Sequence, residues 1–121
     1  MKPDLKLVEA RGDAVTFTFG RFNPPTIGHE KLMDATKKGS RNYRVYASHT
    51  QDSRRNPLDY NTKVRYMKRM FPKHSRSITS SNDRTAIDVA VKLHDEGFKN
   101  LTMVVGSDRV KEFQKLLDDY N

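Results

Sequence analysis

The sequence predicts an α/β fold, a Rossmann-like parallel sheet with helices on both faces. Short runs of β-branched and aromatic residues alternate along the chain with longer stretches in which apolar residues recur at helical spacing. The connections between them are short, and a β-α-β alternation of this kind gives parallel strands. The clearest strands are expected at residues 14–19 and 101–105, with weaker ones at 43–48 and 76–80.

The composition fits a single small domain. The chain has 121 residues, of which 35% are hydrophobic, and a mean hydropathy of -0.86, so its core is modest. We expect residues 1–13 to form a charged leader segment and residues 14–121 to form the domain. No run of about 18 apolar residues is present and residues 1–12 lack the apolar centre of a signal peptide, so we expect no membrane partner and a cytoplasmic location.

The charge and the missing cysteines limit the chemistry. The chain contains no cysteine, which excludes disulfides and thiolate metal sites, and it has no pair of histidines at metal-ligand spacing, so we assign no metal ligands. The formal charge is +8 and the isoelectric point is about 9.8, which favours polyanionic partners. Nucleotide phosphates and nucleic acid both meet that description.

One stretch between the first strand and the first helix points to a phosphate site. It reads Gly20-Arg21-Phe22-Asn23-Pro24-Pro25-Thr26-Ile27-Gly28-His29. Gly20 lets the backbone approach a ligand, and the two prolines delay the helix until Thr26, which we expect to be its N-cap. Thr26 and His29 are neighbours on the first turn, where unpaired N–H groups and the helix dipole favour an anion. The residues Gly28, Leu32, Ala35 and Gly39 are expected on one face of this helix.

This stretch resembles the nucleotidylyltransferase superfamily, whose signature is Gly-x-Phe-x-Pro-x-(His/Thr)-x-Gly-His, here in the Thr-x-Gly-His form. It is also similar to phage-encoded nucleotidyltransferase-like proteins, which would place the chain in the host cytoplasm or the virion. The resemblance implies a strand order of 3-2-1-4. It also implies a nucleoside triphosphate, ATP or CTP, bound with Mg²⁺.

The resemblance also assigns roles to residues. Thr26 and His29 would contact the triphosphate, His29 would stabilise charge on the departing pyrophosphate, and Arg21 would be a further phosphate contact. The remaining residues of the stretch implied to bind the nucleotide are Gly20, Phe22, Asn23 and Gly28. The reaction implied is transfer of a nucleoside monophosphate to a phosphate-bearing acceptor, by in-line attack on the α-phosphate.

A polar loop at residues 48–58 follows the second strand, at the edge of a parallel sheet where ligands bind. By resemblance it supplies a basic residue for the acceptor phosphate or the triphosphate. Arg55 is the first choice and Arg54 the second, while His49 is an alternative. The loop would otherwise be a solvated basic segment.

Asp59 is expected to cap a helix over residues 60–71 that buries Val64, Met67 and either Met70 or Phe71. Its other face is basic, through Lys63, Arg65, Lys68 and Arg69, and the charge continues at Lys73, His74 and Arg76. By resemblance Lys63 points at the active site. The other basic residues would contact nucleic acid, an acidic partner or only water.

The second half of the chain repeats the strand-turn-helix pattern. Asn82 or Asp83 is expected to cap a helix with an apolar stripe that ends at Gly97. The strand at residues 101–105 is followed by Gly106-Ser107-Asp108, and by resemblance these three residues line the nucleotide pocket, with Arg109 a further candidate. Ser107 or Asp108 is alternatively an ordinary N-cap.

The resemblance further implies a fifth strand and a phosphate-gripping helix beyond Asn121, so the domain is expected to be C-terminally incomplete. An incomplete site leaves a second hypothesis open. In it the chain is a catalytically reduced domain that serves as a structural or interaction module, as a phage particle component or by binding nucleic acid. Because an unpaired sheet edge invites pairing with another chain, we also expect an oligomer or a larger assembly.

Overall fold

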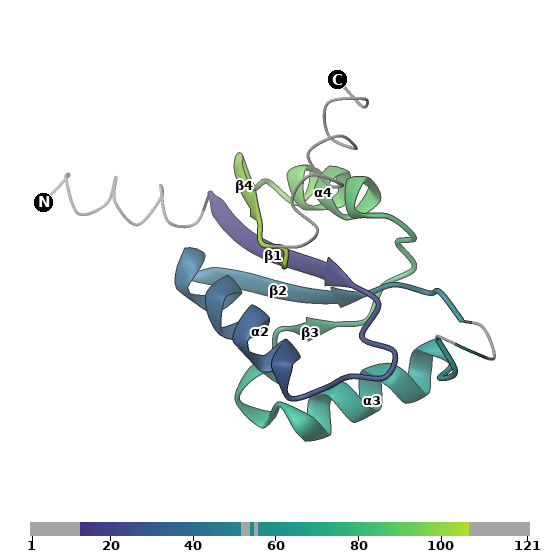
Figure 1. The fold of residues 1–121 in the computed structure, drawn as a ribbon. Coiled ribbons are helices and arrows are strands. Elements are labelled where there is room, and N and C mark those ends of the chain that lie inside the picture. Colours follow the sequence, from purple (N-terminus) through teal and green to yellow (C-terminus); the bar gives the residue numbers. More distant parts are fainter. Residues whose placement is uncertain (1–12, 52–53, 55, 107–121) are drawn as a thin grey trace, which may run out of the picture.

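The computed structural model describes residues 13–51, 54 and 56–106, and within them it contains a four-stranded parallel sheet. The strands are β1 (Ala14–Gly20), β2 (Asn42–Ala47), β3 (Ile78–Thr79) and β4 (Asn100–Met103). They lie in the order β3-β2-β1-β4, which confirms the predicted order (Figure 1). Almost all of the predicted leader, Arg55, Ser107, Asp108 and Arg109 lie outside the described residues.

Helices cover both faces of the sheet, as predicted. One face carries α2 (Gly28–Gly39) and α3 (Tyr60–Met70), which is followed by the short 3-10 helix η1 (Pro72–His74). The other face carries α4 (Ala86–Asp95) (Figure 1). Of these helices none is long and apolar enough to cross a membrane, within the part of the chain that the structure describes.

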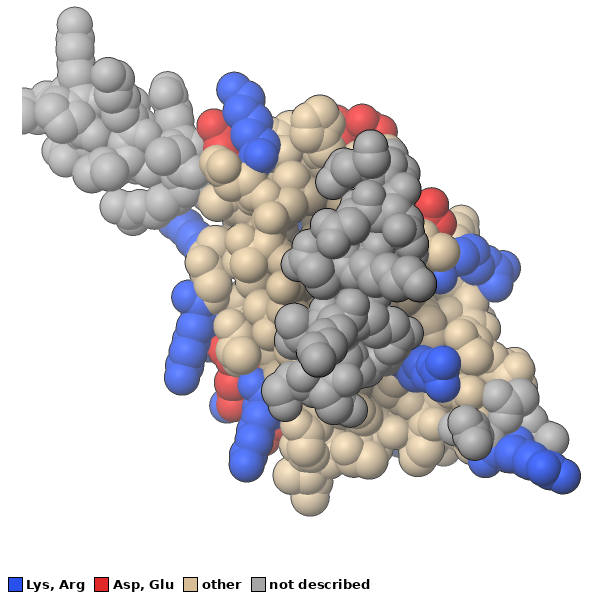
Figure 2. All heavy atoms as spheres, turned by 45° about the horizontal axis from the view of Figure 1, so that its top comes forward, with Lys and Arg blue, Asp and Glu red and all other residues tan. Residues whose placement is uncertain are grey.

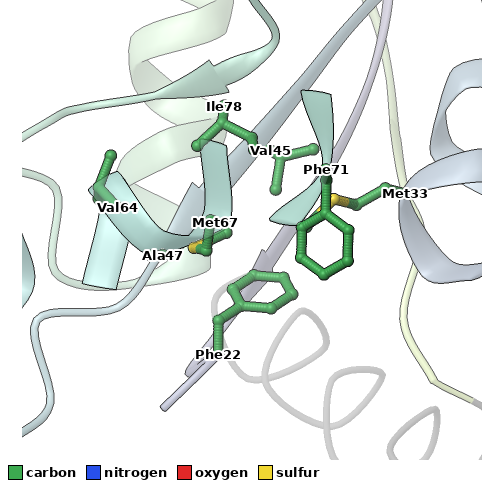
Figure 3. Packing of buried hydrophobic residues seen from close by; sticks show 8 residues of the cluster. All are labelled: Phe22, Met33, Val45, Ala47, Val64, Met67, Phe71 and Ile78. Atoms are coloured by element: carbon green, nitrogen blue, oxygen red, sulfur yellow. The ribbon is translucent and has the colours of Figure 1, made fainter. Parts of the chain in front are cut away.

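Each face has its own apolar core. The larger core lies under α2 and α3 and is formed by Phe22, Met33, Val45, Ala47, Val64, Met67, Phe71 and Ile78 (Figure 3). The smaller core lies under α4 and is formed by Val15, Phe17, Tyr46, Val89 and Leu93. The side chains of β1 alternate between the two faces, as the period of a strand requires. The hydroxyls of its two buried threonines each have a hydrogen-bond partner. Thr16 Oγ1 lies 2.7 Å from Ser40 Oγ, and Thr18 Oγ1 donates to the Val104 carbonyl at 2.7 Å.

The start and the buried face of α2 differ from the sequence prediction. The helix begins at Gly28, its N-cap position is Ile27, and no side chain caps it, so the prediction that Thr26 is the N-cap is wrong. The buried residues of the helix are Met33 and Thr36, whereas Ala35 is exposed. Thr36 tolerates burial because its hydroxyl donates to the Leu32 carbonyl at 2.7 Å. The predicted face is right in part, since Leu32 packs against the larger core, while Ala35 does not lie on the buried face.

The other two helices match the predictions more closely. Asp59 caps α3 by accepting a 2.8 Å hydrogen bond from the Thr62 N–H, and of the two alternatives Phe71 is buried while Met70 is exposed. The cap of α4 is Thr85, which accepts from the Asp88 N–H at 3.1 Å, so neither Asn82 nor Asp83 is the cap. Thr85 was overlooked because two good capping residues precede it in the sequence.

The contact between Gly39 and β1 gives a test of the packing. A Cβ atom at Gly39 would lie 2.4 Å from Thr16 Oγ1 and 2.6 Å from its Cγ2, whereas at Gly28 it would meet only Thr26 Oγ1, at 3.8 Å. We expect Gly39→Ala to lower the free energy of unfolding by about 1–3 kcal/mol through overpacking, measured by urea denaturation. Gly28→Ala is the matched control and is expected to cost less than about 0.5 kcal/mol. Equal stability of the two variants would contradict this packing.

Candidate functional site

The candidate site lies at the carboxyl edge of the sheet, where β1 and β2 end. The Ser48 N–H donates to the Gly20 carbonyl at 2.7 Å, which joins the end of β1 to the start of the loop after β2. On the other side β1 pairs with β4 as far as Phe17 and Met103, and Gly106 follows three residues after the end of β4. The predicted stretch, which begins at Gly20, and the loop after β2, which begins at Ser48, therefore meet at one edge, the usual ligand edge of a parallel sheet.

The buried ring of Phe22 packs against the His29 imidazole. Its backbone is in the left-handed region with φ at 46°, which is uncommon for a residue with a side chain, and its ring is 2% exposed. The ring makes an edge contact with His29, with 4.8 Å between ring centroids. A Cβ atom at Gly20 would lie 3.2 Å from the Phe22 ring, so the glycine leaves room for it. Phe22 is thus buried beneath His29 as a support for its imidazole.

Thr26 and His29 lie together, as the sequence predicts. His29 Nδ1 accepts a 2.9 Å hydrogen bond from the Thr26 N–H and lies 3.3 Å from Thr26 Oγ1. Since an N–H donor faces Nδ1, the neutral ring carries its proton on Nε2. Burial lowers the pKa of His29 below its ordinary value of 6.5, which also favours the neutral ring. The arrangement fixes His29 as a neutral Nε2–H donor.

The first turn of α2 places the positive end of a helix beside this imidazole. The His29 and Glu30 N–H groups bond back to the Thr26 and Ile27 carbonyls at 3.0 Å each, and no side chain caps the helix. The amino end of a helix carries partial positive charge, which stabilises an anion. Gly28 is exposed at this end and lets a ligand approach the backbone closely. The turn is therefore suited to a phosphate group.

Asn23 ties the stretch to the loop after β2. Its side chain donates to the Leu58 carbonyl at 2.7 Å and accepts from the Leu58 N–H at 2.8 Å, and a longer 3.4 Å bond reaches the Thr50 carbonyl. It is only 8% exposed. Asn23 was predicted to bind the nucleotide, but in the structure its amide is occupied by the loop. Its role here is to hold the two segments together.

Lys63 reaches the same edge from within the protein. Its side chain is fully buried, and Nζ donates to the Ser48 carbonyl at 2.7 Å. Burial lowers its pKa from 10.5 to about 8, so the ammonium is charged at neutral pH. No ion pair joins it to a carboxylate among the described residues. Lys63 was predicted to belong to the basic face of its helix, which is wrong, because it is a buried cation beside the end of β2. That it points at the active site stays a prediction.

The remaining predicted residues are more peripheral. Arg21 is exposed in the stretch at residues 20–29, and Arg54 is exposed in the loop after β2. His49 stacks on the Tyr60 ring at 3.8 Å between centroids and its Nε2 donates to the Ser81 carbonyl at 2.7 Å, so it has a structural role. Beside this stack is a hollow of about 500 Å³ that is also lined by Lys92. No sequence pattern predicts this stack, because His49 and Tyr60 belong to different elements.

Comparison with known proteins does not identify a family. No protein-family model matches the chain, and no curated protein matches it. Among the described residues no group of three or more His, Asp or Glu side chains could hold a metal ion.

The neutral state of His29 can be tested by NMR. The pKa of His29 is lower in the folded chain than its ordinary value of 6.5. The contribution of the neutral ring to the free energy of unfolding is therefore fully present above pH 6.5 and is lost as the pH falls below 6.5 through the folded pKa. We expect the ring to titrate below pH 6.5 with its neutral proton on Nε2, measured by proton-nitrogen correlation spectra of the imidazoles. A ring that titrates above pH 6.5, or that carries its proton on Nδ1, would contradict the geometry.

The Asn23 contacts can be tested by substitution. Asn23→Ala removes two short hydrogen bonds and leaves the Leu58 N–H and carbonyl without this partner, so we expect a loss of about 2–3 kcal/mol in unfolding free energy. Asn82→Ala, at an exposed loop position, is the matched control and should change it by less than about 0.5 kcal/mol. Chemical denaturation measures both, and similar losses in the two variants would show that Asn23 does not hold the loop.

Proposed function

We propose that the protein is a nucleotidylyltransferase whose triphosphate site is the turn between β1 and α2. The observation that carries the proposal is the neutral Nε2–H donor of His29 at the uncapped amino end of α2. This combination offers a hydrogen-bond donor and a positive helix end to one phosphate. The resemblance of residues 20–29 to the superfamily signature supports the same assignment.

The charges at the edge of the sheet support a polyphosphate ligand over a single phosphate. The Lys63 ammonium lies against the Ser48 carbonyl, and Ser48 in turn is bonded to Gly20. Arg21 and Arg54 extend the positive charge outward. Lys63 has no carboxylate partner among the described residues, and a buried cation is stabilised by a nearby anion, so binding a triphosphate offsets part of the cost of burying it.

In the proposed reaction a phosphate oxygen of the acceptor attacks the α-phosphorus of ATP or CTP. The bond from that phosphorus to the oxygen that bridges the α- and β-phosphates breaks, and pyrophosphate leaves with the bonding electrons. The His29 Nε2–H donates a hydrogen bond to the oxygen on which charge develops, while Thr26 and Arg21 orient the phosphates. No covalent enzyme intermediate and no general base are required.

Mg²⁺ belongs to this proposal as part of the substrate. The described residues offer no carboxylate cluster for it, so we assign the ion to phosphate oxygens of the nucleotide and derive no step through it. The acceptor would approach from the side of the loop at residues 48–58, next to the hollow lined by His49 and Lys92. Since nucleoside triphosphates are abundant in the cytoplasm, the proposal includes a cytoplasmic location.

Calorimetric titration with Mg-ATP and Mg-CTP tests the proposal. We expect one of them to bind with a dissociation constant between micromolar and low millimolar, and His29→Ala to weaken that binding by roughly tenfold or more because a hydrogen bond to a charged phosphate is lost. His94→Ala removes an exposed histidine of α4 and should leave the affinity unchanged. Pyrophosphate release with phosphorylated acceptors then tests turnover.

Two results would contradict the proposal. One is the absence of heat and of thermal stabilisation with either nucleotide, which would favour the interaction-module hypothesis. The other is binding that His29→Ala and His94→Ala weaken equally, which would place the nucleotide elsewhere on this basic protein.

A further inference from the structure

A basic surface lies at the edge of the sheet opposite the candidate nucleotide site. Seven exposed side chains form it, and we call them the basic edge: Lys37, Lys38, Arg41, Lys68, Arg69, Lys73 and Arg76. They come from the last turns of α2 and α3 and from the segments that lead into β2 and β3. Because these helices run back against the strand direction, both carboxyl ends meet the amino edge of the sheet, at the left of Figure 1.

Few acidic side chains balance this charge. The sequence contains no aspartate or glutamate from Tyr60 to Ser80. Asp34 is the acidic residue in contact with the basic edge, and its Oδ1 lies 3.1 Å from Lys73 Nζ. The structure records no ion pair of Lys37 or Lys38 with any described residue. Figure 2 shows Lys and Arg side chains projecting along the left border of the molecule, with some acidic ones among them.

Three lysines of the basic edge line a hollow in the surface. A hollow of about 440 Å³ is lined by Asp34, Lys37, Lys38 and Lys73, which brings the end of α2 next to η1. A buried histidine holds one lining residue in place, since His74 Nε2 lies 2.7 Å from Asp34 Oδ1 and His74 Nδ1 lies 2.8 Å from the Tyr43 hydroxyl. His74 was predicted to be part of the exposed charge, but it is fully buried. The lysines therefore surround a shaped hollow.

The spread of the charges favours a polymer of phosphates over a single small anion. The basic edge spans the ends of two helices and both following segments, which is more than one phosphate group can contact. A membrane surface is disfavoured because it requires several exposed apolar side chains beside the basic ones. In the described residues the large exposed apolar side chains are Ile27, Tyr66, Met70 and Val91, and only Met70 lies in the last turn of α3.

Tyr66 favours single strands among nucleic acids. It is 43% exposed, and Met70 follows it one turn later toward the basic edge. An exposed aromatic ring beside a basic groove stacks on unpaired bases and accepts any sequence. We propose that the basic edge binds single-stranded nucleic acid through its backbone phosphates, with one phosphate in the hollow of Lys37, Lys38 and Lys73 and with Tyr66 stacked on a base.

Fluorescence anisotropy with labelled 20-residue oligo-dT and oligo-rU tests this inference. Lys37→Gln, Lys38→Gln and Arg76→Gln together remove three charges from the basic edge. We expect this triple variant to bind about tenfold or more weakly at low salt, and its plot of log affinity against log salt to be flatter by about 2, at about 0.7 per lost phosphate contact. Tyr66→Ala should weaken binding with the salt slope unchanged.

The matched control carries Lys31→Gln, Arg84→Gln and Lys92→Gln, which remove three charges at exposed positions away from this edge. It should bind the oligonucleotides within about twofold of the unchanged protein. Equal weakening in the two triple variants, no binding of either oligonucleotide at 50 mM salt, or binding of anionic lipid vesicles in their place would each overturn the inference. Mg-ATP binding by the Lys37, Lys38 and Arg76 variant should be unchanged, which separates this surface from the proposed nucleotide site.

Discussion

The fold and the candidate site both depend on the backbone of Ser48, where β2 leaves the sheet. Its N–H donates to the Gly20 carbonyl, and its own carbonyl accepts the Lys63 ammonium, each at 2.7 Å. Ser48 is 5% exposed, so these bonds are shielded from water and are costly to break. One residue thus connects the end of β1, the loop after β2 and α3. The edge that holds β1 and β2 in register is also the edge that shapes the candidate phosphate site.

Lys63 makes this arrangement depend on charge. Removing an ammonium from water is unfavourable, and burial lowers the pKa of Lys63 to about 8. In the unfolded chain the pKa of Lys63 keeps its ordinary value of 10.5. Between pH 8 and pH 10.5 the unfolded chain therefore binds more protons than the folded one, so the free energy of unfolding increases as the pH rises through this range. At neutral pH the ammonium stays charged, and an anion bound at this edge would relieve that cost. Burying Lys63 thus lowers the stability of the folded protein and raises its affinity for an anion at this edge.

The sequence predicted the features that arise from local patterns and missed those that depend on distant partners. Periodicity and turn residues predicted the four parallel strands and the Asp59 cap, because these follow from neighbouring residues and from the β-α-β alternation, while the strand order came from the resemblance of residues 20–29. The burial of Lys63 and His74 could not be predicted, since their partners lie 15 and 31 to 40 residues away. For the same reason the sequence did not show that the Asn23 amide, which the resemblance assigns to the nucleotide, contacts Leu58, 35 residues away.

The central claim is that a triphosphate binds at the turn between β1 and α2. A proton-nitrogen correlation spectrum, titrated with the Mg²⁺ complex of a non-hydrolysable ATP or CTP analogue at about 150 mM salt, tests it most directly, because screening at that salt suppresses diffuse charge effects. We expect the largest shifts at the amides of Ile27, Gly28 and His29, with a smaller change at Ser48. Shifts confined to residues of the basic edge such as Lys38 and Arg69, or no shifts at saturating analogue, would contradict the account.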